Sequence, residues 1–133
     1  MGPKRVHKVL RKEPKEFGNV LLNSSRETAH MVDRYDRLKK WREILNEDIG
    51  NAVDTFLVDK EHWNGPEYHV ITDTGLTMVY NSRTLKLISI LISRPQQLKR
   101  NYEALGLKIP SIIHKLIKKF ISRLNQGYDL NNW

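Results

Sequence analysis

Three short apolar runs, each closed by turn residues, occupy residues 67–92 and constrain the fold more than any other part of the chain. The first two are separated by Asp-Thr-Gly at residues 73–75, where Gly75 can supply the positive backbone angle of a tight hairpin. The next two are separated by Asn-Ser-Arg at residues 81–83, where Asn81 can do the same. The pattern predicts a three-stranded antiparallel meander.

Two helices are predicted after this meander. Pro95 suits a first helical turn, Leu98 and Tyr102 lie on one apolar stripe, and Gly106 is a stop signal. Beyond Pro110 the apolar residues repeat at helical spacing opposite lysines: Ile112, Ile113, Leu116, Ile117, Phe120, Ile121 and Leu124. An apolar stripe opposite lysines also suits a helix lying on a membrane surface. We favour a helix that covers one face of the sheet, since a small sheet needs such a cover.

The first half of the chain is predicted to be helical. Residues 1–18 are basic and contain two prolines, which predicts an arm that is flexible or weakly anchored. Ser24 and Glu27 have the spacing of a capping box, so a helix is expected to start there. Residues 49–57 repeat apolar side chains with helical periodicity. We therefore predict one α+β domain over residues 19–133, with helices packed on an antiparallel meander of three or more strands.

The net charge of +8 is concentrated at the two ends of the chain. Residues 1–18 carry six Lys or Arg against two Glu, and residues 94–123 carry eight against one. A segregated basic surface attracts polyanions because each phosphate it neutralises releases counterions. RNA is the expected partner and DNA the alternative, although the charge excess can also serve solubility alone.

Composition points to a cytoplasmic protein. The 133 residues contain no cysteine, which excludes disulfides and thiolate metal sites and fits a reducing compartment. The apolar runs are too short to span a bilayer, and no apolar signal core follows the N-terminal charges. We expect no membrane association and no cofactor.

The order of several polar motifs resembles phage and mobile-element members of the barnase, EndoU, colicin and RelE-like nuclease superfamily. The motifs cover about half of the chain and are, in order, His30, Arg34 and Arg37 in HMVDRYDR, Tyr68-His69, Gly75, Val79-Tyr80-Asn81, Thr84, Leu87-Ile88-Ser89 and the segment from Arg94 to Arg100, RPQQLKR. The resemblance implies a small α+β domain and metal-independent RNA cleavage. Ser89 departs from the pattern, since such sequences often carry Thr in the last strand.

The residue types suit that chemistry. Cleavage of RNA without a metal needs a base for the 2′-hydroxyl proton, an acid for the leaving 5′ oxygen, and donors for the charge on the phosphorane. His69 is the candidate acid or base and His30 its candidate partner. Arg94 suits the phosphate, because its planar fork can donate two bonds. Thr84, Ser89 and Gln97 can donate to a nonbridging oxygen, while the expected further nucleic-acid contacts are Arg34, Arg37, Lys99 and Arg100.

Each assignment has a structural alternative. If Val70 faces the core, strand alternation turns His69 outward, where a lone His is often merely solvated. His30 can be an ordinary helix-surface residue, and Arg94 can cap the turn before the helix. Thr84 and Ser89 also suit strands by propensity. His62 lies near His69 in sequence, but no third ligand is evident, so no metal site is predicted.

Three functions follow from these observations. The first is a metal-independent endoribonuclease that acts by 2′-hydroxyl transesterification. The second is a non-catalytic module of a phage or mobile element that binds nucleic acid or protein. The third is a toxin-like protein held by an acidic antitoxin or immunity protein. Salt-sensitive binding without cleavage would select the second, and a tight acidic partner the third.

Overall fold

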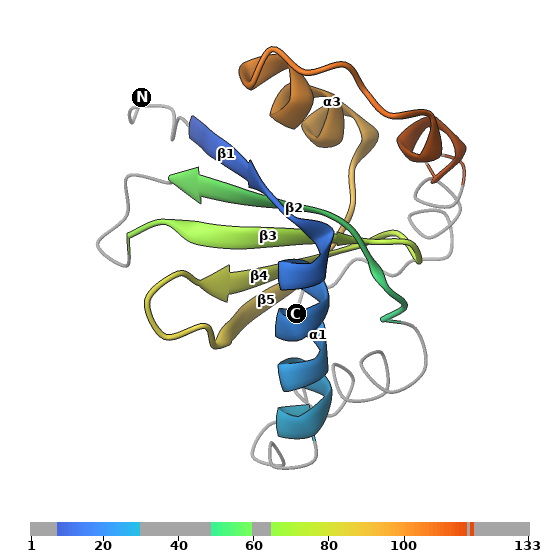
Figure 1. Cartoon of the computed structure of the whole chain (residues 1–133). Helices are drawn as coiled ribbons and strands as arrows, with labels where there is room; N and C mark the ends of the chain where they lie inside the picture. Colours follow the sequence, from blue (N-terminus) through green and yellow to red (C-terminus); the bar gives the residue numbers. More distant parts are fainter. Residues whose placement is uncertain (1–7, 30–48, 60–64, 117, 119–133) are drawn as a thin grey trace, which may run out of the picture.

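A computed structural model describes residues 8–29, 49–59, 65–116 and 118, which form a five-stranded antiparallel sheet flanked by helices. The sheet is a meander with strand order β1-β2-β3-β4-β5 (Figure 1). The elements are β1 (Lys8–Glu13), α1 (Lys15–Ala29), β2 (Ala52–Asp59), β3 (Glu67–Thr72), β4 (Leu76–Asn81), β5 (Leu87–Ile92) and α3 (Pro95–Ala104). Residues 111–116 and 118 are also helical. The predicted α+β class is confirmed.

The three predicted strands of the meander are confirmed as β3, β4 and β5. Gly75 has a φ of 91°, and its N–H donates to the carbonyl of Thr72 at 3.2 Å, which closes the first hairpin. In the second connection the positive φ expected at Asn81 is found at Leu85 instead, with a φ of 60°. Asn81 organises this turn through its side chain, because its Oδ1 accepts from the backbone N–H groups of Arg83 and Thr84 at 2.8 and 3.0 Å. Turn chemistry at both positions therefore sets the register of the sheet.

The predicted helix over residues 49–57 is wrong, because residues 52–59 form the strand β2. This strand pairs with β1 on one side and β3 on the other, and both of its faces are covered. A strand buried on both faces carries apolar side chains without strict alternation, so its sequence can imitate helical periodicity. A register shift between Ala52 and Asp54 further obscures the alternation.

The N-terminal segment is also built differently from the prediction. Residues 8–13, expected in a weakly anchored arm, form the edge strand β1, and α1 begins at Lys15 rather than at Ser24. Ser25, next to the expected cap, lies inside α1 and donates from its hydroxyl to the carbonyl of Leu21 at 3.1 Å. The same Ser25 hydroxyl lies 2.7 Å from the hydroxyl of Tyr80 in β4. Residues 30–48, into which the helix expected from Ser24 would extend, lie outside the described residues.

Two hydrophobic cores lie on opposite faces of the sheet, with α1 crossing one face and α3 lying over the other (Figure 1). Leu21 and Leu22 of α1 pack on the first face, while Leu98 and Tyr102 of α3 pack on the second. Burial of these side chains is the main favourable term for docking both helices. Both faces of the sheet are therefore covered, so strand residues on either face can be buried.

The C-terminal helices follow the prediction as far as they are described. Helix α3 has Pro95 in its first turn, and Gly106 follows it with a φ of 66°. In the next helical segment Ile113 and Leu116 are buried in the core under α3, whereas Ile112 and Lys115 are exposed. Of the predicted stripe, Ile113 and Leu116 thus pack on the sheet, Ile112 does not, and the residues from Ile117 onward named in it lie outside the described residues. No helix in the described part of the chain is long and apolar enough to cross a membrane.

Candidate functional site

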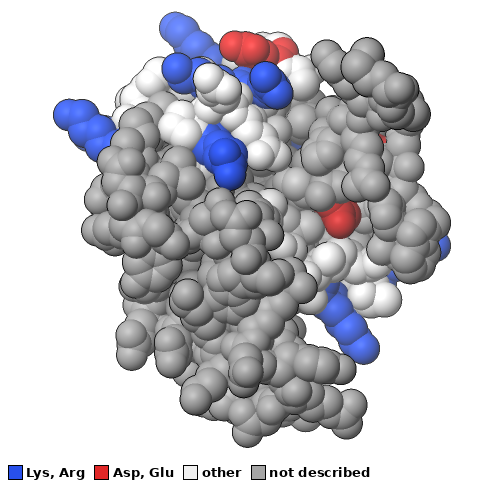
Figure 2. Space-filling model, turned by 180° about the vertical axis from the view of Figure 1, so that it is seen from behind, with Lys and Arg blue, Asp and Glu red and all other residues white. Residues whose placement is uncertain are grey.

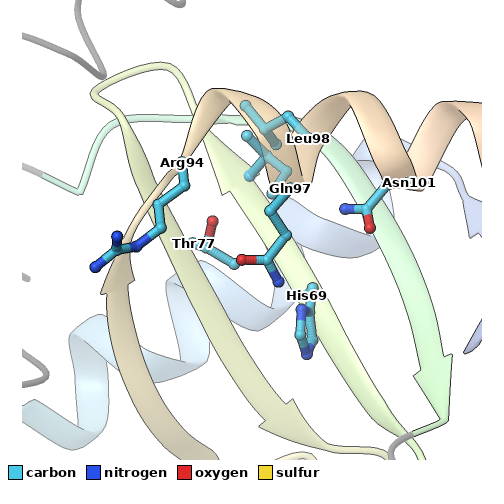
Figure 3. Close-up of a pocket in the computed structure, with 7 residues that line it drawn as sticks. His69, Thr77, Arg94, Gln97, Leu98 and Asn101 are labelled. Carbon is cyan, nitrogen blue, oxygen red and sulfur yellow. The ribbon is translucent and has the colours of Figure 1, made fainter. Parts of the chain in front are cut away.

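A small hollow lies between the first turns of α3 and the sheet strands below them (Figure 3). It holds about 190 Å³ of space between atoms, counted out to the open solvent at its mouth. Its lining residues come from β3, β4, α3 and the residue before α3: His69, Ile71, Thr77, Arg94, Gln97, Leu98 and Asn101. Three of the residues proposed from sequence therefore meet here: His69, Arg94 and Gln97.

His69 forms part of the floor of this hollow. It lies on the face of β3 that carries Ile71, pairs with Phe56 in β2 and Val79 in β4, and is only 2 % exposed. The sequence argument that His69 faces outward because Val70 faces the core is wrong, since α3 covers the second face as well. His69 Nε2 lies 3.4 Å from Oε1 of Glu67, a long contact that places a carboxylate beside the ring.

Arg94 lies at the rim of the hollow, and Gln97 lies in α3, which forms its roof. Arg94 is the residue preceding α3, with an extended backbone, and its exposed side chain makes no capping hydrogen bond to the helix. Gln97 is half-buried, and its carboxamide points from α3 toward the sheet and His69 (Figure 3). In Figure 3 the imidazole of His69 lies below the carboxamide of Gln97, whereas the guanidinium of Arg94 lies to one side and points away from both.

Ser89 and Thr84 do not join this cluster. Val79 pairs with both His69 and Ser89, so Ser89 lies on the same face of the sheet as His69 but two strands away. Strand spacing makes that separation roughly 10 Å. Thr84 lies in the exposed β4–β5 connection, where its hydroxyl accepts from the N–H of Lys86 at 3.3 Å. Neither residue lines the hollow.

Basic side chains surround the site on the outside of α3. Lys99 and Arg100 are exposed, and residues 94–118 carry six Lys or Arg against the single acidic residue Glu103. Figure 2 shows several Lys and Arg side chains in the upper part of the view, next to acidic side chains. The remaining candidates, His30, Arg34 and Arg37, lie outside the described residues.

Sequence reasoning missed four polar residues of this region. Thr77 and Ser93 are buried, and their hydroxyls lie 2.8 Å apart at the side of the hollow. Glu67 contacts His69, and its position two residues earlier on the same strand face could have indicated the pair. Asn101 is 7 % exposed and follows Gln97 by one helical turn, a spacing that places both on one face of α3.

A polar cluster of the buried Tyr102 and Asp54 with the exposed Lys12 links α3 to the sheet. The hydroxyl of Tyr102 in α3 donates to Oδ2 of Asp54 in β2, and Lys12 Nζ of β1 lies 2.9 Å from Asp54 Oδ1. Burial, followed by the hydrogen bond to Asp54, raises the pKa of Tyr102 well above its ordinary 10.0. We assign this cluster a structural role, since none of its members lines the hollow.

Metal coordination receives no support from the described side chains. Within residues 8–29, 49–59, 65–116 and 118, no group of three or more His, Cys, Asp or Glu is placed to hold a metal ion. The chemistry offered by the hollow is proton transfer at His69 and hydrogen-bond donation from Arg94 and the carboxamides.

No protein-family model matches this sequence, and comparisons with curated proteins and with solved structures found no significant match. The residues and their geometry therefore carry the functional argument.

Proposed function

We propose that this chain is an RNA-directed protein that cleaves RNA without a metal, by attack of the 2′-hydroxyl on the neighbouring phosphate. The observation that carries the proposal is the meeting of His69, Arg94 and Gln97 at one hollow beside the basic outer face of α3. The chemistry of these three side chains suits RNA cleavage, and they come from different elements of the fold. Their convergence supports a shared role.

The proposed reaction uses His69 for one proton transfer. The 2′ oxygen loses its proton to a base and bonds to phosphorus, the bond from phosphorus to the 5′ oxygen breaks, and an acid protonates that oxygen. The products are a 2′,3′-cyclic phosphate and a 5′-hydroxyl. An imidazole can act as acid or base, and we assign His69 the acid role. Arg94 and Gln97 then stabilise the charge on the nonbridging oxygens.

The second proton-transfer group has to approach from the other side of the phosphate, because the attacking and leaving oxygens lie in line. Glu67 is adjacent to His69 and does not meet that requirement. His30 stays our candidate for this role on the sequence argument alone. Thr84 and Ser89 lie outside the hollow, so we assign them no contact with the scissile phosphate.

A non-catalytic module that binds nucleic acid is the second candidate. Its supporting observation is the 2 % exposure of His69, which leaves an RNA phosphate little access to the ring. The basic face of α3 would bind RNA in either case. We propose the cytoplasm as the site of action, and an acidic antitoxin or immunity protein as a further partner of the same basic surface.

Cleavage assays in EDTA test the proposal. We expect the wild-type protein to convert bacterial RNA into fragments ending in a 2′,3′-cyclic phosphate, and His69→Asn to lose this activity by a factor of about 100 or more. His114→Asn is the matched control, since His114 is exposed and does not line the hollow. Far-ultraviolet circular dichroism must show that the His69 variant is folded. Equal cleavage by His69→Asn and wild type would refute the role of His69.

A further inference from the structure

The inner face of α3 presents two carboxamides, those of Gln97 and Asn101, to the hollow above His69. Asn101 is 7 % exposed, and its side chain points from α3 toward the sheet (Figure 3). Among the described residues neither carboxamide has a hydrogen-bond partner, although the other buried polar side chains of the hollow are engaged: His69 with Glu67, and Thr77 with Ser93. Asn101 is largely buried and Gln97 half-buried, and a largely buried polar side chain without a protein partner calls for an explanation, of which a bound ligand or water is one.

The electrostatics of the hollow favour an anion over a cation. None of its seven lining residues is acidic, and Arg94 stands at its rim. The first turn of α3 contains no acidic residue, so the partial positive charge of the helix N-terminus is not neutralised from within that turn. The carboxylate of Glu67 lies beside His69 Nε2 and does not line the hollow.

The size of the hollow limits the ligand further. Its enclosed part accommodates about one water-sized group, with the remaining space open to solvent. A flat nucleobase does not fit into it, whereas one oxygen of a tetrahedral anion does. The other oxygens of such an anion would then lie at the mouth of the hollow, within reach of Arg94 only if its side chain turns toward the hollow.

We propose that this hollow is an oxyanion site for a phosphate group, in which the side-chain NH₂ groups of Gln97 and Asn101 donate to one phosphate oxygen. Arg94 at the rim neutralises the charge of the anion. The proposal adds Asn101 to the substrate-contacting residues and rests on the proposed function only in taking the phosphate to be part of RNA. A free phosphate ion is the other source of the same chemistry.

Titration with inorganic phosphate, followed by ¹H–¹⁵N nuclear magnetic resonance, tests the site directly. The side-chain NH₂ signals of Gln97 and Asn101 are expected to shift and saturate with phosphate, and not with chloride at equal ionic strength. An absence of saturable shifts in the wild-type protein would overturn the proposal and would leave the hollow as a site for water.

Three variants sharpen the test. Gln97→Glu and Asn101→Asp each replace a donor with a negatively charged acceptor of the same shape, so each is expected to weaken phosphate binding about tenfold or more. Gln96→Glu is the matched control, because Gln96 is the exposed neighbour of Gln97 and does not line the hollow. Equal weakening by Gln96→Glu and Gln97→Glu would reduce the effect to general electrostatics and overturn the proposed contact. Gln97 is half-buried, so Gln97→Glu is expected to fold even if Asn101→Asp does not, and it then tests the site alone.

A short RNA oligonucleotide separates the two sources of phosphate. If RNA shifts the same two side-chain signals and competes with inorganic phosphate, the ligand is a phosphodiester. If inorganic phosphate alone binds, the site takes the free ion, and the phosphodiester assignment is wrong. Phosphate binding without RNA cleavage would refute the proposed catalysis and leave the oxyanion site standing, so the two failures are distinguishable.

Discussion

The hydroxyl of Tyr102 donates a hydrogen bond to the buried carboxylate of Asp54, which ties α3 to the second strand of the sheet. The two residues lie 48 positions apart in the sequence, and Lys12 adds an ion pair to the same carboxylate from β1. Because α3 also carries Gln97 and Asn101, this bond fixes the roof of the hollow to its floor. Stability and site geometry are thus expected to be linked.

Tyr102→Phe should lower the free energy of unfolding by about 1–3 kcal/mol at neutral pH, because it removes a donor from a buried carboxylate. The raised pKa of Tyr102 adds a pH dependence. Folding favours the protonated phenol, so its stabilisation is fully present below the ordinary tyrosine pKa near 10 and is lost as pH rises above it. Urea unfolding of both proteins from pH 7 to 11 should show the gap between them narrowing above pH 10. A constant gap would contradict the assignment.

Thr55→Val should raise the free energy of unfolding by about 1 kcal/mol, because a buried hydroxyl without a partner is replaced by a methyl group of the same shape. Thr55 is 0 % exposed, and among the described residues its Oγ1 is the one side-chain atom fully shielded from solvent without a hydrogen bond. Thr72→Val is the matched control: its hydroxyl binds Thr74 and the N–H of Leu76, so thermal unfolding should show a loss of stability. Destabilisation of both variants would mean that Thr55 has a partner.

Leu85→Gly should raise stability by up to about 1 kcal/mol, since Leu85 has a φ of 60°, a conformation that glycine adopts without strain. The side chain is 42 % exposed, so its packing contributes little. Leu107→Gly serves as the control, because Leu107 is similarly exposed at 44 % and has no positive φ. Differential scanning calorimetry should show a higher Tm for the first variant only. A lower Tm for Leu85→Gly would show that side-chain packing outweighs the backbone strain.

The double variant Lys99→Glu with Arg100→Glu reverses two charges on α3. It should lower the affinity for RNA and make that affinity less sensitive to salt concentration. For every phosphate that the variant no longer neutralises, the slope of log K against log salt concentration should flatten by about 0.7 for single-stranded RNA. The charge-matched control is Arg83→Glu with Lys86→Glu on the exposed β4–β5 connection. Fluorescence anisotropy over a salt series measures both. Equal weakening in the two double variants would mean that net charge, rather than the face of α3, determines binding.

The second half of the fold could be predicted from sequence because its signals are local. Glycine and asparagine at the hairpin turns, Pro95 at a helix start and a regular apolar stripe after Pro110 each act over a few residues. The first half was predicted wrongly where tertiary contacts decide. Strand β2 carries apolar residues toward two cores, and β1 is a strand because β2 pairs with it, neither of which is a local property.

The candidate site could be predicted only in part for the same reason. His69, Arg94 and Gln97 have side chains whose chemistry suits RNA cleavage, and the fold places them at one hollow. The burial of His69 depends on α3 covering the second face of the sheet, which strand alternation does not reveal. Asn101 gave no sequence signal of its own, because a single asparagine in a basic helix is typical of a solvated surface. Its importance appears only from its burial above the sheet.

The most direct test of the central claim compares an RNA oligonucleotide with its 2′-O-methyl counterpart of the same sequence, each incubated with the protein in EDTA. We expect the protein to cleave the RNA to a 2′,3′-cyclic phosphate and to leave the methylated strand intact while still binding it, because the attacking 2′ oxygen is blocked. Binding of both strands with cleavage of neither would contradict the proposed catalysis and favour the non-catalytic module. Cleavage of both would contradict the 2′-hydroxyl mechanism.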